Sequence, residues 1–292
     1  MDTKELNEMR GRLRGLAEYL RGCIKGQEHV IGCVVSVLQR GELGLAHHGR
    51  PKGSFLLVGP TGTGKTELTN AFTGYLFGGA KPLRFDMSEY QNQSSVEKLI
   101  GEKVGDIGLL GRVLAKAEAV HGGNGGALLF DEIEKAHPLV LDLFLQILDD
   151  ASITLASGER KNLSGYYIVC TSNIGAAEAM RMQSAPFASI ERTVLARVNQ
   201  TLRPELVGRM TEKVVFARLP YAVQREICEA MIAGELARLR KLGHEITITP
   251  DDVETILRTG FHKTLGARPM RGAVERFLQD RVAGGLLGGM SK

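Results

Sequence analysis

The segment SFLLVGPTGTGKTEL, residues 54–68, is the strongest indication of fold class in this 292-residue chain. It opens with a short apolar run that ends at Gly59, the pattern of a buried strand, and helical spacing of apolar residues returns over 65–77. The segment from Gly59 to Thr66 fits G-x-x-x-x-G-K-[ST], which binds phosphate when it follows a strand and opens a helix. A turn that matches this pattern by chance is disfavoured by the strand and helix on either side.

The residues of this loop suit phosphate chemistry. Its glycines let backbone N–H groups converge on phosphate oxygens, and the helix N-terminus adds partial positive charge. We expect Lys65 to reach the β- and γ-phosphates of a nucleotide and the Thr66 hydroxyl to ligate Mg²⁺. The predicted cofactor-binding residues are therefore Gly59, Pro60, Thr61, Gly62, Thr63, Gly64, Lys65 and Thr66.

An acidic pair, Asp131 and Glu132, follows a second apolar run at 127–130. We predict that Asp131 is the second Mg²⁺ ligand beside Thr66, and that Glu132 polarises the attacking water. The pair could instead cap the next helix, but the strand-like run before it favours the catalytic role. These parts predict ATP and Mg²⁺ as cofactors without distinguishing a motor from a kinase or a GTPase.

The rest of the chain alternates between strand and helix patterns as far as residue 218. Helical spacing covers 3–22 and 28–40, and strand candidates besides 54–59 are LRFDM (83–87), ALLFD (127–131), YYIVCTS (166–172) and KVVFA (213–217). This alternation predicts an α/β fold with a parallel sheet covered by helices on both faces. We expect a large α/β domain over 1–218, including an N-terminal helical segment, and a small, mainly helical lid over 219–292 with one short strand at 245–249.

Composition narrows the class of protein. With 43% hydrophobic and 24% charged residues the chain is typical of globular proteins, and it lacks the roughly 20-residue apolar run of a membrane span. Its start has no secretory pattern, so we expect a cytoplasmic protein. Four cysteines without a C-x-x-C pair predict buried free thiols, with neither a zinc knuckle nor disulfides. A net charge of +4 leaves nucleic-acid binding possible but unsupported.

From Gly26 to the last helix the chain resembles the Clp family of AAA+ ATPases, most closely the second ATPase module of Clp disaggregases and unfoldases. The motifs that carry the resemblance, in the family's order, are GSFLLVGPTGTGKTEL, RFDMSEY, LLFDEIEKAHP, LQILDD, TSNIG, RPELVGRM and GARPMR. The resemblance implies a P-loop AAA+ sheet flanked by helices, followed by a small helical lid. It also implies a homo-oligomer, a hexameric ring in the family.

The resemblance also implies roles for single residues. Asn173 corresponds to the sensor residue that helps to place the attacking water, and it is otherwise a turn residue at a strand end. Arg209 corresponds to the arginine finger that completes the site of a neighbouring subunit, and Arg268 to the second sensor arginine on the lid. Either arginine could instead form a surface salt bridge. Ile24 and Gly26 correspond to the segment beside adenine.

One loop departs from the family. Members thread polypeptide with an aromatic pore loop, Gly-Tyr-Val-Gly, whereas this chain has GDIGL at 105–109, with Asp106 in place of the tyrosine. A carboxylate in a pore stays hydrated and repels acidic segments, so conventional threading is in doubt. Ile107, Leu109 and Leu110 could provide an aliphatic grip, Asp106 could contact a basic partner, or the loop could be a solvated turn.

Two functions are consistent with these residues. The first is an ATP-hydrolysing oligomeric motor that remodels or unfolds a protein or protein complex; the second is an ATP-dependent assembly or scaffold switch on a larger complex or DNA. Nothing in the motifs suggests a nucleotide binder without turnover. We find no Ile-Gly-Phe or Ile-Gly-Leu tripeptide between 175 and 200, so a Clp peptidase partner is not expected. We expect a stand-alone module whose substrate or adaptor the sequence does not name.

Overall fold

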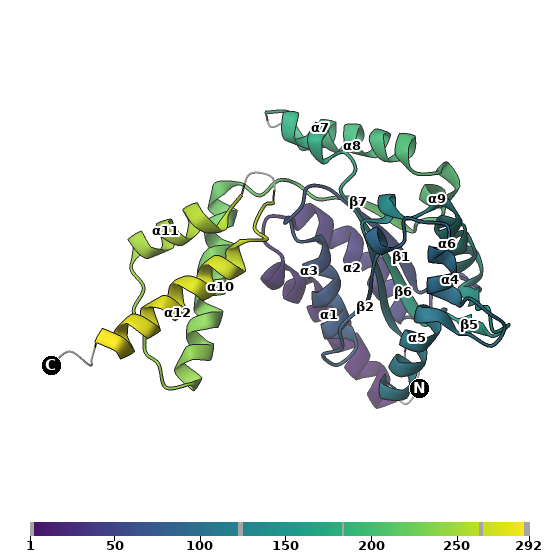
Figure 1. Cartoon of the computed structure of the whole chain (residues 1–292), viewed down its shortest axis with the longest axis horizontal. Helices are drawn as coiled ribbons and strands as arrows, with labels where there is room; N and C mark the ends of the chain where they lie inside the picture. The colour runs from purple at the N-terminus through teal and green to yellow at the C-terminus, as the bar shows by residue number, and fades with distance from the viewer. Residues whose placement is uncertain (1–2, 122–124, 183, 263–264, 289–292) are drawn as a thin grey trace. The chain divides into compact units, whose positions relative to one another are not determined.

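The structure is a computed structural model that describes residues 3–121, 125–182, 184–262 and 265–288. Contacts between residues divide the chain into two units. The first contains Met1–Gly59 and Gly64–Phe216, and the second contains Pro60–Thr63 and Ala217–Lys292. Each unit has its own hydrophobic core, and the sheet belongs to the first (Figure 1).

The first unit is built on a five-stranded sheet in which all neighbouring strands are parallel. In spatial order the strands are β2 (Leu83–Asp86), β3 (Gly126–Asp131), β6 (Tyr166–Ser172), β1 (Gly53–Val58) and β7 (Glu212–Val215). Every residue of β1 and β6 is buried, which explains why these strands are continuous apolar runs. Because the strands run the same way, the segments that follow β1, β3 and β6 meet at one edge of the sheet.

Helices cover both faces of this sheet. Figure 1 shows α1 (Thr3–Cys23), α2 (Glu28–Glu42) and α3 (Lys65–Leu76) on one side, and α4 (Ser95–Ile100), α5 (Gly108–His121) and α6 (Pro138–Asp150) on the other. Alternate strand residues supply the two cores: Leu129 and Val169 face α1–α3, whereas Phe130 and Cys170 face α4–α6. Two apolar layers therefore hold the central strands in register. The loops at the carboxyl ends of these strands consequently start from fixed positions.

Shorter elements complete the first unit. They are the 3₁₀ turns η1 (Met87–Glu89) and η2 (Ile133–Lys135), the hairpin β4 (Ser152–Thr154) and β5 (Arg160–Asn162), and the helices α7 (Ala176–Arg181), α8 (Phe187–Thr201) and α9 (Pro204–Arg209). The turn η2 follows directly after the acidic pair at the end of β3. Its position brings the segment 132–134 beside β6.

The second unit is helical, with α10 (Tyr221–Lys241), α11 (Pro250–Gly260) and α12 (Met270–Gly288) around a core that includes Cys228 and Leu257. At the start of α11, Thr249 and Asp252 form a capping box, because each side chain accepts from the other's backbone N–H. No described helix in either unit is both long and apolar enough to cross a membrane.

These observations confirm the predicted α/β class and its five parallel strands. The strand expected at 245–249 is wrong, since no strand forms there. Ile246 and Ile248 instead pack their side chains against the core of the second unit, so the apolar alternation reflects burial without a strand partner. The β4–β5 hairpin was not predicted, because its strands are only three residues long and largely polar.

The cysteines also correct the prediction in part. Cys170 and Cys228 are buried, as expected, but Cys23 and Cys33 are exposed. Both exposed thiols lie on helices that turn only one stripe toward the core, and the helical apolar pattern around them does not include their positions.

Candidate functional site

The phosphate loop has a backbone that only glycine adopts readily. Gly59 has φ +142° and Gly64 has φ +107°, in regions that L side chains rarely occupy. A Cβ on Gly59 would also lie 2.7 Å from the carbonyl oxygen of Phe216. Gly64 is the N-cap of α3, so the first N–H groups of that helix open onto the loop. This cradle fits a phosphate group, as the sequence pattern requires.

Lys65 joins the loop to the end of β6. Its buried Nζ donates to the carbonyl oxygen of Gly59 at 2.6 Å and to Oδ1 of Asn173 at 3.1 Å. The ammonium therefore lies between the first residue of the loop and the residue after β6. Thr66 follows on the first turn of α3 and is half-buried.

Asp131 ends β3 with both carboxylate oxygens engaged. Oδ1 accepts from the Thr171 hydroxyl, and Oδ2 accepts from Nη2 of Arg84 at 2.6 Å. Asp131 is buried, whereas Arg84 on β2 is half-exposed. These two partners orient the carboxylate and balance its charge, which is the kind of support that oxygen ligands of a metal ion usually have.

Glu132 has a strained backbone. Its φ and ψ are 57° and 53°, the left-handed region that costs a residue with a Cβ about 1–2 kcal/mol. Its N–H donates to the Thr171 hydroxyl at 3.1 Å, so one hydroxyl contacts both members of the acidic pair. Strain of this kind at the end of a strand is typical of active sites, where the surrounding structure imposes the conformation.

Asn173 is held at three points. Its Oδ1 accepts from Lys65, its Nδ2 donates to Oε1 of Glu132 at 3.0 Å, and its backbone N–H donates to Oε1 of Glu134 at 3.0 Å. The orientation of the amide follows from its neighbours, because an ammonium only donates and a carboxylate only accepts. One side chain thus connects the phosphate-loop lysine with the acidic pair.

The two predicted arginines lie outside this cluster of hydrogen bonds. Arg209, at the end of α9, donates from Nε to Asp149 at 2.6 Å and from Nη1 to the carbonyl oxygen of Glu205 at 3.1 Å. Arg268 is exposed and lies in the second unit, just before α12. The structure gives each a place in its own unit and does not test the role that we predicted for it.

The segment predicted to contact adenine lies beside the phosphate loop. Ile24 is buried between α1 and α2, and its Cγ2 would be 3.8 Å from a Cβ built on Gly64. Gly26 has φ +70°, which allows the chain to turn sharply there. This proximity is compatible with a base bound next to the loop.

In the loop predicted to line a pore, the side chain of Asp106 bonds to the backbone of the loop itself. Its carboxylate accepts from the backbone N–H groups of Glu102 and Gly108, at 3.0 Å each, and these bonds hold the pKa of Asp106 below its usual value. Ile107 and Leu109 are half-buried against the core. The exposed apolar side chain in this loop is Val104, at 97% exposure. Leu110 is fully buried, so its expected part in a grip is wrong. Gripping by Ile107 and Leu109 and contact of Asp106 with a basic partner stay predictions.

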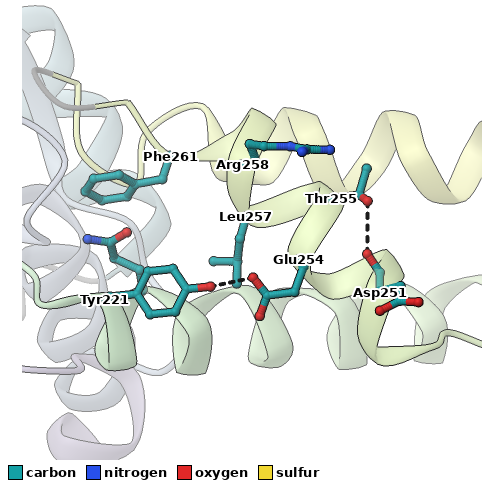
Figure 2. Close-up of a pocket in the computed structure, with 8 residues that line it drawn as sticks. Tyr221, Asp251, Glu254, Thr255, Leu257, Arg258 and Phe261 are labelled. Atoms are coloured by element: carbon teal, nitrogen blue, oxygen red, sulfur yellow. Dashed lines mark hydrogen bonds between the residues drawn. The ribbon is translucent and has the colours of Figure 1, made fainter.

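A hollow of about 560 Å³ lies in the second unit, between the start of α10 and α11. Figure 2 shows the Tyr221 hydroxyl directed at the Glu254 carboxylate, with Arg258 and Phe261 on the adjoining turn. The exposed charges and open walls of this hollow do not resemble a phosphate cradle. The cluster around Lys65 is therefore the candidate site.

Sequence reasoning missed three residues of that cluster. Thr171 is the first residue of the TSN motif, and a hydroxyl at the end of a buried strand was a usable signal. Arg84 and Glu134 gave no such signal, because pairing of Arg84 with Asp131 depends on β2 lying next to β3. Among the described residues no group of three or more His, Cys, Asp and Glu could hold a metal ion. A metal here would depend on a hydroxyl, one carboxylate and the nucleotide's own oxygens.

A parallel sheet with a phosphate loop after β1, an acidic pair after β3 and a polar residue after β6 defines a P-loop ATPase of the AAA+ class. Residues 50–213 match the family described as AAA domain (Cdc48 subfamily). Residues 219–292 match the family described as C-terminal, D2-small domain, of ClpB protein. The chain belongs to the Clp/Hsp100 family of AAA+ ATPases, as its motifs predicted, and nucleotide binding follows from this membership.

Similar proteins span the whole chain. An ATP-dependent Clp protease ATP-binding subunit ClpA homolog from Porphyra purpurea is 36% identical over 99% of this chain and 37% of that protein. The chaperone protein ClpB of Aquifex aeolicus is 34% identical over 96% of this chain and 29% of that protein. A structure of Hsp104 with ATPγS and FITC casein matches 96% of this chain and 49% of that chain, with a TM-score of 0.84 and 29% identity. The chain spans about a third of the length of its curated relatives.

Proposed function

We propose that this chain is an ATP-hydrolysing, oligomeric module that remodels or unfolds a protein or protein complex. The observation that carries the proposal is the hydrogen-bonded set Lys65, Asn173 and Glu132, which connects a phosphate cradle to a carboxylate able to activate water. Relatives named as chaperones and as ATP-binding subunits of a protease support a protein substrate.

In this proposal the loop from Gly59 to Thr66 binds the phosphates of ATP through its backbone N–H groups. Lys65 then exchanges its bond with the Gly59 carbonyl for the β- and γ-phosphate oxygens while Asn173 keeps it in place. Ile24 and Gly26 border the adenine.

Thr66 and Asp131 would hold Mg²⁺. The donor set fits this ion, because a hydroxyl and a carboxylate are hard oxygen ligands and Mg²⁺ takes few protein ligands besides phosphate oxygens. When bound, Mg²⁺ neutralises charge on the phosphate oxygens. Arg84 and Thr171 fix the direction of the Asp131 carboxylate, so that its position does not depend on the ion.

Glu132 would act as the general base that takes a proton from the attacking water. Its left-handed backbone turns the side chain away from the path of the strand and toward Asn173. Asn173 donates to this carboxylate through Nδ2 and accepts from Lys65 through Oδ1, so one amide relates the position of the base to that of the phosphate loop. Arg209 would serve the site of a neighbouring subunit, and Arg268 would report the nucleotide state to the domain at 219–292.

The test of hydrolysis is steady-state phosphate release by the purified chain with ATP and Mg²⁺. We expect Glu132→Gln to lose nearly all turnover and to retain nucleotide affinity, and Lys135→Ala, an exposed neighbour in the same turn, to resemble the wild type. Normal turnover by Glu132→Gln would exclude Glu132 as the base.

The test of shared sites is subunit mixing. Arg209→Ala rings keep Glu132, and Glu132→Gln rings keep Arg209, so mixed rings contain some intact composite sites. We expect each variant alone to be inactive and the mixture to regain part of the turnover, with oligomer size followed by light scattering. No recovery in rings shown to exchange subunits would contradict a finger that acts in trans.

The second candidate is an ATP-dependent assembly or scaffold switch, and the inward-turned Asp106 favours it because the loop offers few apolar side chains for gripping. A tagged unstable substrate separates the two functions. Unfolding with ATP supports the motor; ATP-dependent binding of the ring to a larger complex without unfolding supports the switch.

Further parts of the proposal concern the setting of the motor. We place the domain boundary near residue 218 and expect a hexameric ring in the cytoplasm without a Clp peptidase partner; nucleic acid is a partner only in the second candidate function. Sizing of the ATP-bound protein tests the ring, and cell fractionation tests the location.

A further inference from the structure

Glu134 is a partly buried carboxylate next to the candidate site that the hydrolysis scheme above does not use. It lies in the turn η2, one residue beyond Ile133. Its Oε1 accepts from the backbone N–H of Asn173 at 3.0 Å. Its Oε2 is buried and has no hydrogen-bond partner in the part of the chain that the structure describes.

Burial of the Glu134 carboxylate costs more free energy than a side chain with only a packing role would require. Burying a carboxylate oxygen costs free energy unless hydrogen bonds replace those it made with water, and here one of the two oxygens has none. A neutral amide or hydroxyl could accept from the same N–H at a smaller cost. A carboxylate at position 134 is therefore better explained by a need for a strong, fixed hydrogen-bond acceptor than by packing.

The hydrogen bond from Asn173 supplies that reason. A carboxylate accepts from a peptide N–H in a charge-assisted bond, which is shorter and stronger than one between neutral groups. The bond holds the main chain of Asn173, whereas Lys65 and Glu132 hold its side chain. Glu134 thus fixes the base from which the amide reaches both partners.

The positions of Glu132 and Glu134 in one turn also link the two carboxylates to each other. Glu132 and Glu134 are separated by Ile133, whose side chain is fully buried in the core. The two carboxylates consequently leave the same anchored turn and contact Asn173 at different points, one at the side chain and one at the backbone. A shift of Asn173 relative to Glu132 requires that the bond to Glu134 break or that the turn move.

We infer that Glu134 is a positioning residue for ATP hydrolysis, which holds the peptide of Asn173 so that its amide bridges Lys65 and Glu132. This inference rests on the proposed role of Asn173. Because Glu134 acts through Asn173, its loss should lower kcat and leave nucleotide binding intact. Misplacement of a catalytic group by about 1 Å can cost about 100-fold in rate, so we expect kcat to fall by about 10- to 100-fold.

The experiment compares Glu134→Ala and Glu134→Gln with the control Lys135→Ala from the same turn. We expect Glu134→Ala to lower kcat with little change in KM or in the Kd of a fluorescent ADP analogue. Glu134→Gln retains an acceptor oxygen and should keep kcat within a few fold of the wild type. If Glu134→Ala does not fold, Glu134→Met fills a similar volume without an oxygen acceptor and should show the same loss.

A double variant distinguishes positioning from a general structural role. With Asn173→Ala already present, the amide is gone and Glu134→Ala should lower kcat by less than two-fold further. Full additivity of the two losses, or a wild-type kcat in Glu134→Ala or Glu134→Met, would overturn the inference. A wild-type kcat in Asn173→Ala alone would instead show that the proposed role of Asn173 fails, so the two failures can be told apart.

Discussion

The amide Nδ2 of Asn173 lies 3.0 Å from Oε1 of Glu132, although the two residues are 41 positions apart in the chain. The bond spans β3 and β6, neighbouring parallel strands whose carboxyl ends lie at the same edge of the sheet. Since Oδ1 of the same amide accepts from Lys65, the bond also determines how far the carboxylate lies from the phosphate loop.

Replacement of the Asn173 amide by a carboxylate should stop turnover. Asn173→Asp keeps an acceptor for Lys65 but removes the donor to Glu132 and places a second negative charge beside it. Removing one preorganised donor costs about 100- to 1000-fold in kcat, and the added repulsion acts in the same direction. Phosphate release measures the loss, and the same change at exposed Asn199 on α8 is the control. A loss below ten-fold would contradict the bridge.

At Glu132, where the backbone is strained, a glycine variant should be more stable than an alanine variant, the reverse of the usual order within a helix. Glu132→Ala and Glu132→Gly both lose the carboxylate, but only glycine adopts φ 57° without a Cβ penalty. We expect the glycine variant to be more stable by about 1 kcal/mol in urea unfolding. At exposed Ala196 within α8, Ala196→Gly should instead be destabilising by about 1 kcal/mol. Equal stability of the two Glu132 variants would show that the left-handed conformation carries no strain.

A methyl group at Gly59 should damage the phosphate loop more than one at Gly78. Both glycines have positive φ, but a Cβ at Gly59 would meet the Phe216 carbonyl at 2.7 Å, whereas at Gly78 nothing lies within 4 Å. We therefore expect Gly78→Ala to cost only the conformational penalty, about 1 kcal/mol, with normal binding of a fluorescent ADP analogue. Gly59→Ala should lose more stability and at least ten-fold in affinity. Similar behaviour of the two variants would contradict the close approach.

Two of the four cysteines should react with a thiol reagent in the native state at pH 8. Cys23 and Cys33 are exposed, whereas burial raises the pKa of Cys170 and raises that of Cys228 to about 11. Because the thiolate is the reactive form, only about one in a thousand Cys228 thiols is reactive at pH 8. Mass spectrometry of the labelled protein should find Cys23 and Cys33 modified first, and all four after denaturation. Early labelling of Cys170 would contradict its burial.

The hydrogen bonds between the Asp106 carboxylate and the loop backbone should persist in mildly acidic solution. Bonds from the Glu102 and Gly108 N–H groups lower the pKa of this carboxyl from its usual 3.8, so the charged form is favoured by the folded loop. The stabilisation is fully present above pH 3.8 and is lost as the pH falls through the lowered pKa. Hydrogen exchange should therefore find both amides protected at neutral and mildly acidic pH.

Asp106→Ala should remove this protection at every pH, whereas Asp142→Ala, on the exposed side of α6, should leave it unchanged. Protection of the Glu102 and Gly108 amides in Asp106→Ala would show that the carboxylate does not shape the loop. The same two variants reveal whether the exposed Val104 depends on Asp106 for its position.

The fold class and the core of the site could be predicted from local sequence. Apolar runs ended by glycine or by acidic residues determine the buried parallel strands, because such strands have both faces covered. The phosphate loop is equally local, since its glycines, lysine and threonine lie within eight consecutive residues, Gly59 to Thr66. Periodicity predicted a strand that does not form at 245–249, where burial imitated a strand, and it missed the short β4–β5 hairpin.

The distant side chains that complete the site could be identified only from the three-dimensional arrangement of the strands. The pairs Asn173 and Glu134, Arg84 and Asp131, and Thr171 with both acidic residues depend on the order of strands β2, β3 and β6. A sequence states where strands end but not which strands are neighbours, and hydrogen bonds between side chains act over only about 3 Å. The strand order is set by packing of the two apolar layers against the sheet, so these contacts could not be inferred from spacing along the chain.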